Sequence, residues 1–276
     1  MLVTQALIQT IEEAIATERS TFASGMARLL PASGAGWLSV AGGRAIFTGA
    51  DFFGNRAMGL GLHGPVQASD LDRVEAFYTE RGLPAALELA ALADRSLIRL
   101  LRQRGYGLVR FRNIYAQPVG PGSAPALARA TPPAGLELQT VGAANAALWS
   151  LTLLDGFEYT CETDRARVTC WNQMLHSLPE VTSLVALLDG QAVGAASVMF
   201  LDSIALLGGA ATLPAYRRRG IQRALIAARL TLAARTGCAL AIVTADPGSS
   251  SGRNAERSGF QLLGNHVDMQ APDGAR

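Results

Sequence analysis

Apolar residues recur at helical spacing along the first stretch of the chain, MLVTQALIQTIEEAIATER, with glutamates inside the pattern. This predicts an amphipathic helix of the mature protein, because the stretch has neither a basic start nor a signal-type cleavage site. Further along, periodicity and glycine stops predict helices over 71–81 and 96–104 and strands over 85–89 and 108–116.

The second half shows a longer alternation of apolar runs and amphipathic segments. Asp189-Gly190 between two apolar runs is typical of a hairpin turn. In the helix predicted over 222–235, Leu225 begins an apolar face and Arg229 is placed away from that face. The other predicted helices cover 143–154, 165–177 and 250–258, and the predicted strands cover 136–141, 182–188, 192–200, 204–212, 238–245 and 260–269.

A stretch rich in proline and glycine, PVGPGSAPALARATPPAG at 118–135, interrupts these elements and predicts an interdomain linker. We therefore expect a domain at 1–118, a linker at 119–134 and a second domain at 135–276. Helices that end at glycine recur at similar spacing in both halves, which indicates an internal duplication. Two chance glycine stops are the alternative.

Composition narrows the class of protein. With 49% apolar and 17% charged residues, the chain is globular, and no apolar run is long enough for a membrane span. A formal charge of +2 is too small to indicate nucleic-acid binding. The cysteines Cys161, Cys170 and Cys238 form no close CxxC pair, so we expect no metal site and a cytoplasmic location.

The segment 207–230, LGGAATLPAYRRRGIQRALIAARL, carries the most specific chemistry. A hydrophobic strand reaches Pro214, and Arg217-Arg218-Arg219-Gly220 then leads into the 222–235 helix. The first turn of a helix has unpaired N–H groups and a partial positive charge, glycine allows close approach of the backbone, and guanidiniums bind phosphate. Together these features predict a pyrophosphate site.

The alternative is a basic turn that faces solvent. Three arginines at the positive end of a helix repel one another and the dipole, which favours a bound anion. A Walker-type phosphate loop requires a lysine, which the chain lacks, and RRRGIQRA does not supply the glycine fingerprint of a Rossmann fold.

These residues resemble the GNAT superfamily of N-acetyltransferases, whose acyl-CoA signature is [Q/R]-x-x-G-x-[G/A] after a strand that ends in an apolar-Pro pair. LPAYRRRGIQRALI matches this signature at Arg217 and Gly220, although Gln222 stands where a small residue is usual. RNAERSGF at 253–260 is similar to the family's terminal helix and Gly-Phe pair, and the element order over 135–269 agrees. The resemblance implies an α/β protein of two GNAT-like domains, each a mixed, mostly antiparallel sheet flanked by helices. The first domain looks like a degenerate copy, since GLGLHGPVQASD at 59–70 has no arginine where the phosphate loop would lie.

By this resemblance, the second domain binds acetyl-CoA. The strand that ends near residue 213 would hold the pantetheine arm and polarise the thioester carbonyl through a main-chain N–H. The implied cofactor-binding residues are Ala210, Ala211, Thr212, Leu213, Arg217, Arg218, Arg219, Gly220, Ile221, Gln222, Arg223, Ala224 and Asn254.

The proton-transfer residues do not carry over from the family. Many members have a tyrosine as general acid where this chain has Ala255, and 204–212 contains no acid. The polar segment LLDGFEYTCETDR, at 153–165, offers Glu158, Tyr159 and Glu162 as candidates near the acceptor. Ordinary loop polarity, with acids at a helix start, is the alternative. His176 and His266 are more consistent with structural roles.

The resulting hypothesis is an acetyl-CoA-dependent N-acetyltransferase that acts on an amine of an unidentified small molecule or peptide. The alternative is a non-catalytic acyl-CoA-binding or regulatory module, and the missing tyrosine and acid are the reason to consider it. Another acyl-CoA is a further possible donor. No nucleic-acid or membrane partner is expected, and the sequence leaves the oligomeric state open.

Overall fold

The computed structural model of the chain describes residues 4–120 and 132–272. The chain forms two compact units. The described residues of 1–114, 244–247 and 263–276 form unit 1, and those of 115–243 and 248–262 form unit 2. The domain limits expected from the linker stay a prediction.

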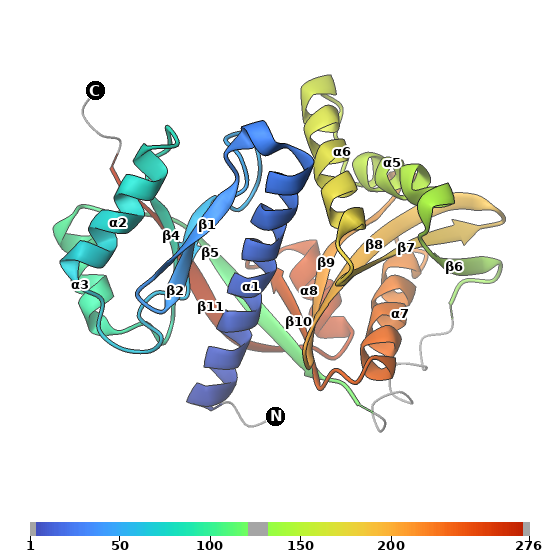
Figure 1. The fold of residues 1–276 in the computed structure, drawn as a ribbon. Coiled ribbons are helices and arrows are strands. Elements are labelled where there is room, and N and C mark those ends of the chain that lie inside the picture. Colours follow the sequence, from blue (N-terminus) through green and yellow to red (C-terminus); the bar gives the residue numbers. More distant parts are fainter. Residues whose placement is uncertain (1–3, 121–131, 273–276) are drawn as a thin grey trace. The chain divides into compact units, whose positions relative to one another are not determined.

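The order of elements repeats between the two halves of the chain (Figure 1). After helix α1 (Gln5–Leu29) and a short 3-10 turn (Pro31–Ser33), the first half contains β1 (Gly36–Val40), β2 (Gly43–Phe47), β3 (Arg56–Met58), α2 (Ala68–Thr79), β4 (Ala86–Ala90), α3 (Arg95–Gln103) and β5 (Gly107–Pro118).

The second half begins with β6 (Leu136–Thr140), a 3-10 turn (Ala143–Asn145), α5 (Ala146–Gly156) and α6 (Glu162–Ser177). It continues with β7 (Val181–Leu188), β8 (Gln191–Leu201), β9 (Ile204–Thr212), a 3-10 turn (Pro214–Tyr216), α7 (Ile221–Arg235), β10 (Leu240–Ala245), α8 (Ser250–Arg257) and β11 (Gln261–Gln270). Three strands, a helix, a strand, a helix and a strand thus occur in the same order in both halves.

The strands form one mixed sheet rather than the two separate sheets expected from the sequence. Its order is β1-β2-β3-β4-β11-β5-β10-β9-β8-β7-β6. The sheet is continuous because the last strands of the two halves exchange places: β11 lies beside β4 of the first half, and β5 lies beside β10 of the second. In the pairing of β11 with β4, His266 lies opposite Ala90.

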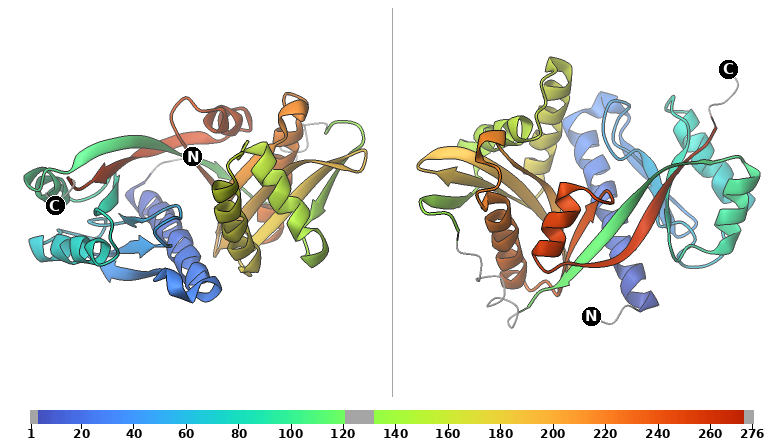
Figure 2. Two further views of the ribbon diagram at one scale, coloured as in Figure 1. Left: turned by 90° about the horizontal axis from the view of Figure 1, so that it is seen from above. Right: turned by 180° about the vertical axis from the view of Figure 1, so that it is seen from behind.

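Each unit has its own apolar core. In unit 1, α1 and α2 pack on β1 and β2, and Leu71, Val74 and Leu97 are among the fully buried side chains. In unit 2, α5 and α6 cover one face of the sheet and α7 covers the other (Figure 2). Ile221 and Leu225 of α7 pack there against strands β7 and β8. Within the described residues, no helix has the length and apolar character needed to cross a membrane.

Candidate functional site

The candidate site lies in unit 2, where β9 leads through Pro214–Tyr216 into α7. Gly220 precedes the helix with a φ of 85°, in the left-handed region that glycine adopts without steric cost. Arg218 is also left-handed, with a φ of 64°, which is uncommon for a residue with a side chain. The backbone therefore bends sharply immediately before the first turn of α7.

The N-terminus of α7 is not neutralised by its own side chains. No side-chain cap is formed there, and the first turn contains no acidic residue. The amides of the first helical turn have no partners within the helix, and they carry the positive end of the dipole. The arginines around this turn are exposed, namely Arg217, Arg218, Arg219 and Arg223. The predicted arginines thus lie exposed around the start of α7.

Arg217 makes the most contacts of these arginines. Its Nη2 donates to the carbonyl oxygen of Gly156 at 2.9 Å and to Oε2 of Glu158 at 2.7 Å, and its Nε donates to the carbonyl of Thr212 at 3.3 Å. This guanidinium therefore joins the C-terminus of α5 to the end of β9. The guanidinium of Arg219 lies over the ring of Tyr216, 5.2 Å from its centroid.

Strand β9 is irregular on one side and only partly paired on the other. Its ladder with β8 has a register shift at which two residues of β9, Gly208 and Gly209, lie opposite the single residue Ser197, so β9 forms a bulge there. On its other side, the ladder that the structure describes with β10 covers only Ile204–Leu206 of β9. The segment from Leu207 to Thr212 thus extends beyond this parallel pairing.

The direction of each amide in this segment follows from one hydrogen bond. Leu213 donates its N–H to the carbonyl of Val193 on the β8 side, at 2.9 Å. Because successive amides along a strand point to opposite edges, the N–H groups of Thr212 and Ala210 point away from β8. Of the four predicted pantetheine residues, Ala210 and Thr212 therefore have available donors, and the N–H of Leu213 is already paired.

Arg229 does not lie where the helical pattern predicts. The pattern places it away from the apolar face, but the side chain is buried, with an exposed fraction of 2%. Its Nη1 donates to the carbonyls of Ser197 and Gly208, both at 3.2 Å, and Nε donates to Leu225 at 3.1 Å. Arg229 thus holds the bulge from within, and burial lowers the pKa of its guanidinium to about 10. Its i+4 spacing from Leu225 was the signal available in the sequence.

The residues predicted to lie near the acceptor, Glu158, Tyr159 and Glu162, follow directly after α5. Gly156 ends this helix so close to β9 that a Cβ there would lie 2.6 Å from that of Ala211. Glu158 has a left-handed φ of 60° and an exposed side chain that pairs with Arg217. Tyr159 is half-buried, with its ring 6.3 Å from Phe157. The segment is tied down by Arg165, which bonds Asp155 and the carbonyl of Tyr159.

The other predicted site residues occupy plainer positions. Glu162 is exposed in the first turn of α6, where a carboxylate complements the helix dipole. Asn254 is half-buried in α8, and Ala255 beside it has an exposed fraction of 0%. The structure thus places Glu158 beside Arg217 of the predicted phosphate loop, Arg217–Gly220. Glu162 instead lies in the first turn of α6, where a carboxylate stabilises the helix. Over the ranges 4–120 and 132–272, no group of three or more His, Cys, Asp or Glu residues could hold a metal ion.

Solved structures with this fold include two that cover most of the chain. A GCN5-related N-acetyltransferase from Kribbella flavida has a TM-score of 0.64 and 21% identity, covering 93% of this chain and 96% of its own. A functionally unknown conserved protein from Staphylococcus epidermidis has a TM-score of 0.59 and 15% identity, covering 85% and 92%. A tandem GNAT protein from the clavulanic acid biosynthesis pathway has a TM-score of 0.56 and 15% identity, covering 74% and 69%. At these identities the likeness establishes the fold.

The sequence comparisons concern the second half. None of the curated proteins compared with the chain matches it. Residues 147–260 match the model of the acetyltransferase (GNAT) family, and this segment runs from α5 through the phosphate loop to the end of α8. This match identifies residues 147–260, in the C-terminal half, as similar to the GNAT acetyltransferase family.

Proposed function

We propose that unit 2 binds acetyl-CoA and transfers its acetyl group to an amine of a small molecule or peptide. The observation that carries this proposal is the uncapped N-terminus of α7, with Gly220 in a left-handed conformation and exposed arginines around it. A diphosphate fits this chemistry, because it would accept hydrogen bonds from the first-turn amides and offset the arginine charges. The family match over the same residues supports the proposal.

Each part of the site has a distinct role in this proposal. The main chain contacts the diphosphate at Gly220, Ile221, Gln222 and Ala224. The arginines around it supply positive charge. The outward N–H groups of Ala210 and Thr212 would bind the pantetheine arm and polarise the carbonyl, as an oxyanion site does. When bound, acetyl-CoA supplies a thioester carbonyl that a neutral amine can attack.

The acceptor side is proposed to lie at the segment that follows α5. Tyr159 and Glu162 are candidates to bind the amine or accept its proton. Glu158 is also placed there, but its ion pair with Arg217 assigns it a role in balancing the charge of the phosphate loop. Asn254 is proposed to contact the cofactor from α8.

A thermal-shift titration with CoA tests cofactor binding. Gly220→Glu places a carboxylate at the diphosphate position, and we expect it to abolish the stabilisation by CoA. Gly237→Glu is the matched control, because Gly237 has a similar φ of 83°, follows the other end of α7 and has no neighbour within 4 Å of an added Cβ. Both substitutions carry a left-handed strain of about 1–2 kcal/mol. An unchanged CoA response in Gly220→Glu would overturn the assignment of the site.

Acetyl transfer is tested separately, by monitoring free thiol while the protein is mixed with acetyl-CoA and a panel of amines. Release that depends on the amine supports the enzyme. Binding of CoA without such release favours the alternative of a non-catalytic acyl-CoA-binding module, to which the buried Ala255 in place of a tyrosine is suited.

A further inference from the structure

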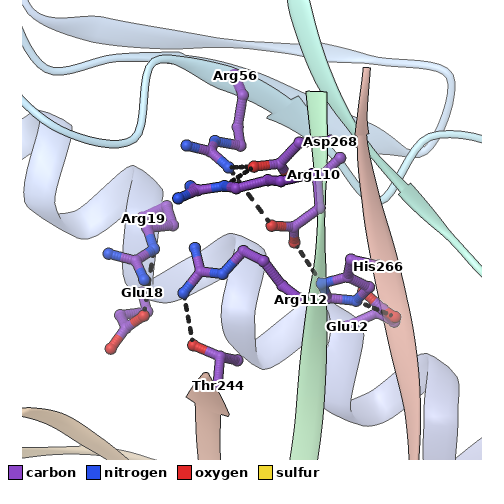
Figure 3. Close-up of polar contacts among 10 residues, drawn as sticks. Glu12, Glu18, Arg19, Arg56, Arg110, Arg112, Thr244, His266 and Asp268 are labelled. Carbon is purple, nitrogen blue, oxygen red and sulfur yellow. Dashed lines mark hydrogen bonds and ion pairs between the residues drawn. The ribbon is translucent and has the colours of Figure 1, made fainter. Parts of the chain in front are cut away.

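Unit 1 contains a group of charged side chains, most of them withdrawn from solvent. It brings together residues of α1, β3, β4, β5 and β11 with one residue of β10, and Figure 3 shows most of its side chains facing one another. We call it the unit 1 polar cluster. Its members are Glu12, Glu18, Arg19, Arg56, Glu88, Arg110, Arg112, Thr244, His266 and Asp268.

One part of the cluster is internally neutralised. The ring of His266 lies between two carboxylates, with Nε2 2.6 Å from Glu12 and Nδ1 2.6 Å from Glu88. Burial alone would lower the pKa of His266, but the charge of Glu88 and the two hydrogen bonds raise it to about 10. His266 is therefore a buried cation with two anionic partners.

The remaining acids are shared unevenly among arginines. Asp268 accepts from Nε of Arg110 at 2.6 Å and also pairs with Arg56. Among the described residues, Glu18 has one ion pair, to Arg19 at 3.5 Å, which is longer than the 2.6 Å contact of Asp268 with Arg110. Burial raises the pKa of Glu18 more than the neighbouring arginines lower it.

Arg112 lacks an anionic partner within the part of the chain that the structure describes. Its Nη2 donates to the hydroxyl of Thr244 at 3.0 Å, and its buried Nε has no hydrogen-bond partner. Burial lowers the pKa of Arg112, and the charges of Arg19, Arg56 and Arg110 lower it further, while the charge of Glu88 raises it in part. Figure 3 shows the guanidinium groups of Arg19, Arg110 and Arg112 turned toward the same space.

From this arrangement we propose that the unit 1 polar cluster binds a small oxyanion, a carboxylate or phosphate group of a ligand, between Arg112, Arg19 and Arg110. The cluster has five cationic groups and four carboxylates, so cationic groups are in excess. Guanidiniums that face one another repel, and an oxyanion between them accepts charge-assisted hydrogen bonds from several. The side chains of Arg19 and Arg110 are 23% and 43% exposed, so a small ligand can reach them from solvent.

This site goes beyond the proposed acetyl transfer, because none of its residues belongs to the phosphate loop of unit 2. The test is a titration of the full-length protein, without CoA, with phosphate, sulfate, acetate and succinate at constant ionic strength set by sodium chloride. Calorimetry and thermal unfolding are the two readouts. We expect saturable binding of at least one oxyanion. Binding of phosphate or sulfate would indicate a phosphate group of the ligand, and binding of acetate or succinate would indicate a carboxylate.

Arg112→Gln is expected to weaken this binding at least about tenfold, since it removes charge-assisted hydrogen bonds from the centre of the site. Arg99→Gln, an exposed arginine of α3 in the same unit, is the control and should bind like the unchanged protein. If Arg112→Gln does not fold, Arg110→Gln replaces it, because that side chain is more exposed. A retained thermal shift with CoA shows that unit 2 is intact in each variant, so failure here is separable from failure of the proposed function. Equal binding by the arginine variants, or no saturable binding by any of the four anions, would overturn the site.

Discussion

Arg217 and Glu158 form an ion pair of 2.7 Å between Nη2 and Oε2, although 59 positions separate them in the sequence. Both side chains are well exposed, at 46% and 59%. The pair connects the phosphate loop, Arg217–Gly220, with the segment after α5. The sequence predicts that the first binds the cofactor and that the second lies near the acceptor. It also gives Arg217 an anionic partner that a cofactor phosphate would have to replace.

Glu158→Gln should therefore bind CoA more tightly than the unchanged protein. An exposed ion pair of this kind contributes about 0.2–1 kcal/mol, which corresponds to an affinity gain of roughly 1.4- to 5-fold. Calorimetric titration with CoA at low ionic strength measures the change. Glu137→Gln, an exposed acid on β6, serves as the control and should leave the affinity unchanged. Weaker CoA binding in Glu158→Gln alone would mean that the carboxylate itself supports the cofactor.

The bulge in β9 should depend on Arg229. Arg229→Met removes the donor to the carbonyls of Ser197 and Gly208, and a buried carbonyl that loses its partner costs about 1–3 kcal/mol. Loss of the desolvated charge offsets part of this cost. We expect a net destabilisation of about 1–3 kcal/mol in urea unfolding, together with weaker CoA binding. Arg235→Met, at the exposed end of α7, should do neither.

The ion pairs of His266 predict that the protein loses stability in alkali. The folded pKa of about 10 lies above the ordinary value of 6.5, so the contribution of His266 is complete below about pH 6.5 and declines as the pH rises toward 10. Urea unfolding measured from pH 6 to pH 10 tests this. His266→Gln should flatten the pH dependence and cost about 3–5 kcal/mol at neutral pH, the range for breaking a buried pair.

The matched control for this measurement is His63→Gln. His63 is exposed in the loop before α2. This variant should keep both the stability and the pH dependence of the unchanged protein. A steep alkaline decline that persists in His266→Gln would assign the effect to another group.

Thiol reactivity should differ sharply among the three cysteines. Cys161 is exposed before α6, and hydrogen bonds from the backbone of Asp164 and Thr163 lower the pKa of its thiol. Burial raises the pKa of Cys170, and Cys238 is buried. Timed alkylation with iodoacetamide, followed by peptide mass spectrometry, should label Cys161 first. Equal rates at Cys161 and Cys170 would contradict this reading.

Local periodicity was sufficient to predict most elements of the second half. The limits of β9, 204–212, agree with the observed strand, and the helix predicted over 222–235 differs from α7 by one residue. These elements are defined by their own apolar pattern and by flanking glycine or proline. The three short strands β1, β2 and β3 were not predicted, and β3, with three residues, is too short to give a periodic signal.

Long-range pairing was the part that the sequence could not supply. The exchange of β5 and β11 depends on which strand edge each one meets, and a strand's own residues do not specify its partner. For the same reason, Arg112 and Glu18 appeared as ordinary charges of a strand and a helix. Only the fold shows that they share one buried cluster.

The pairing of β11 with β4 also sets an order of events during synthesis. Residues 86–90 leave the ribosome long before residues 266–270. The edge of β4 that pairs with β11 therefore stays unpaired until β11 has been synthesised. Contacts so distant along the chain form slowly, and an open edge is a template for wrong pairing. Chaperone demand should therefore be greatest late in translation, and it should end when β11 is added.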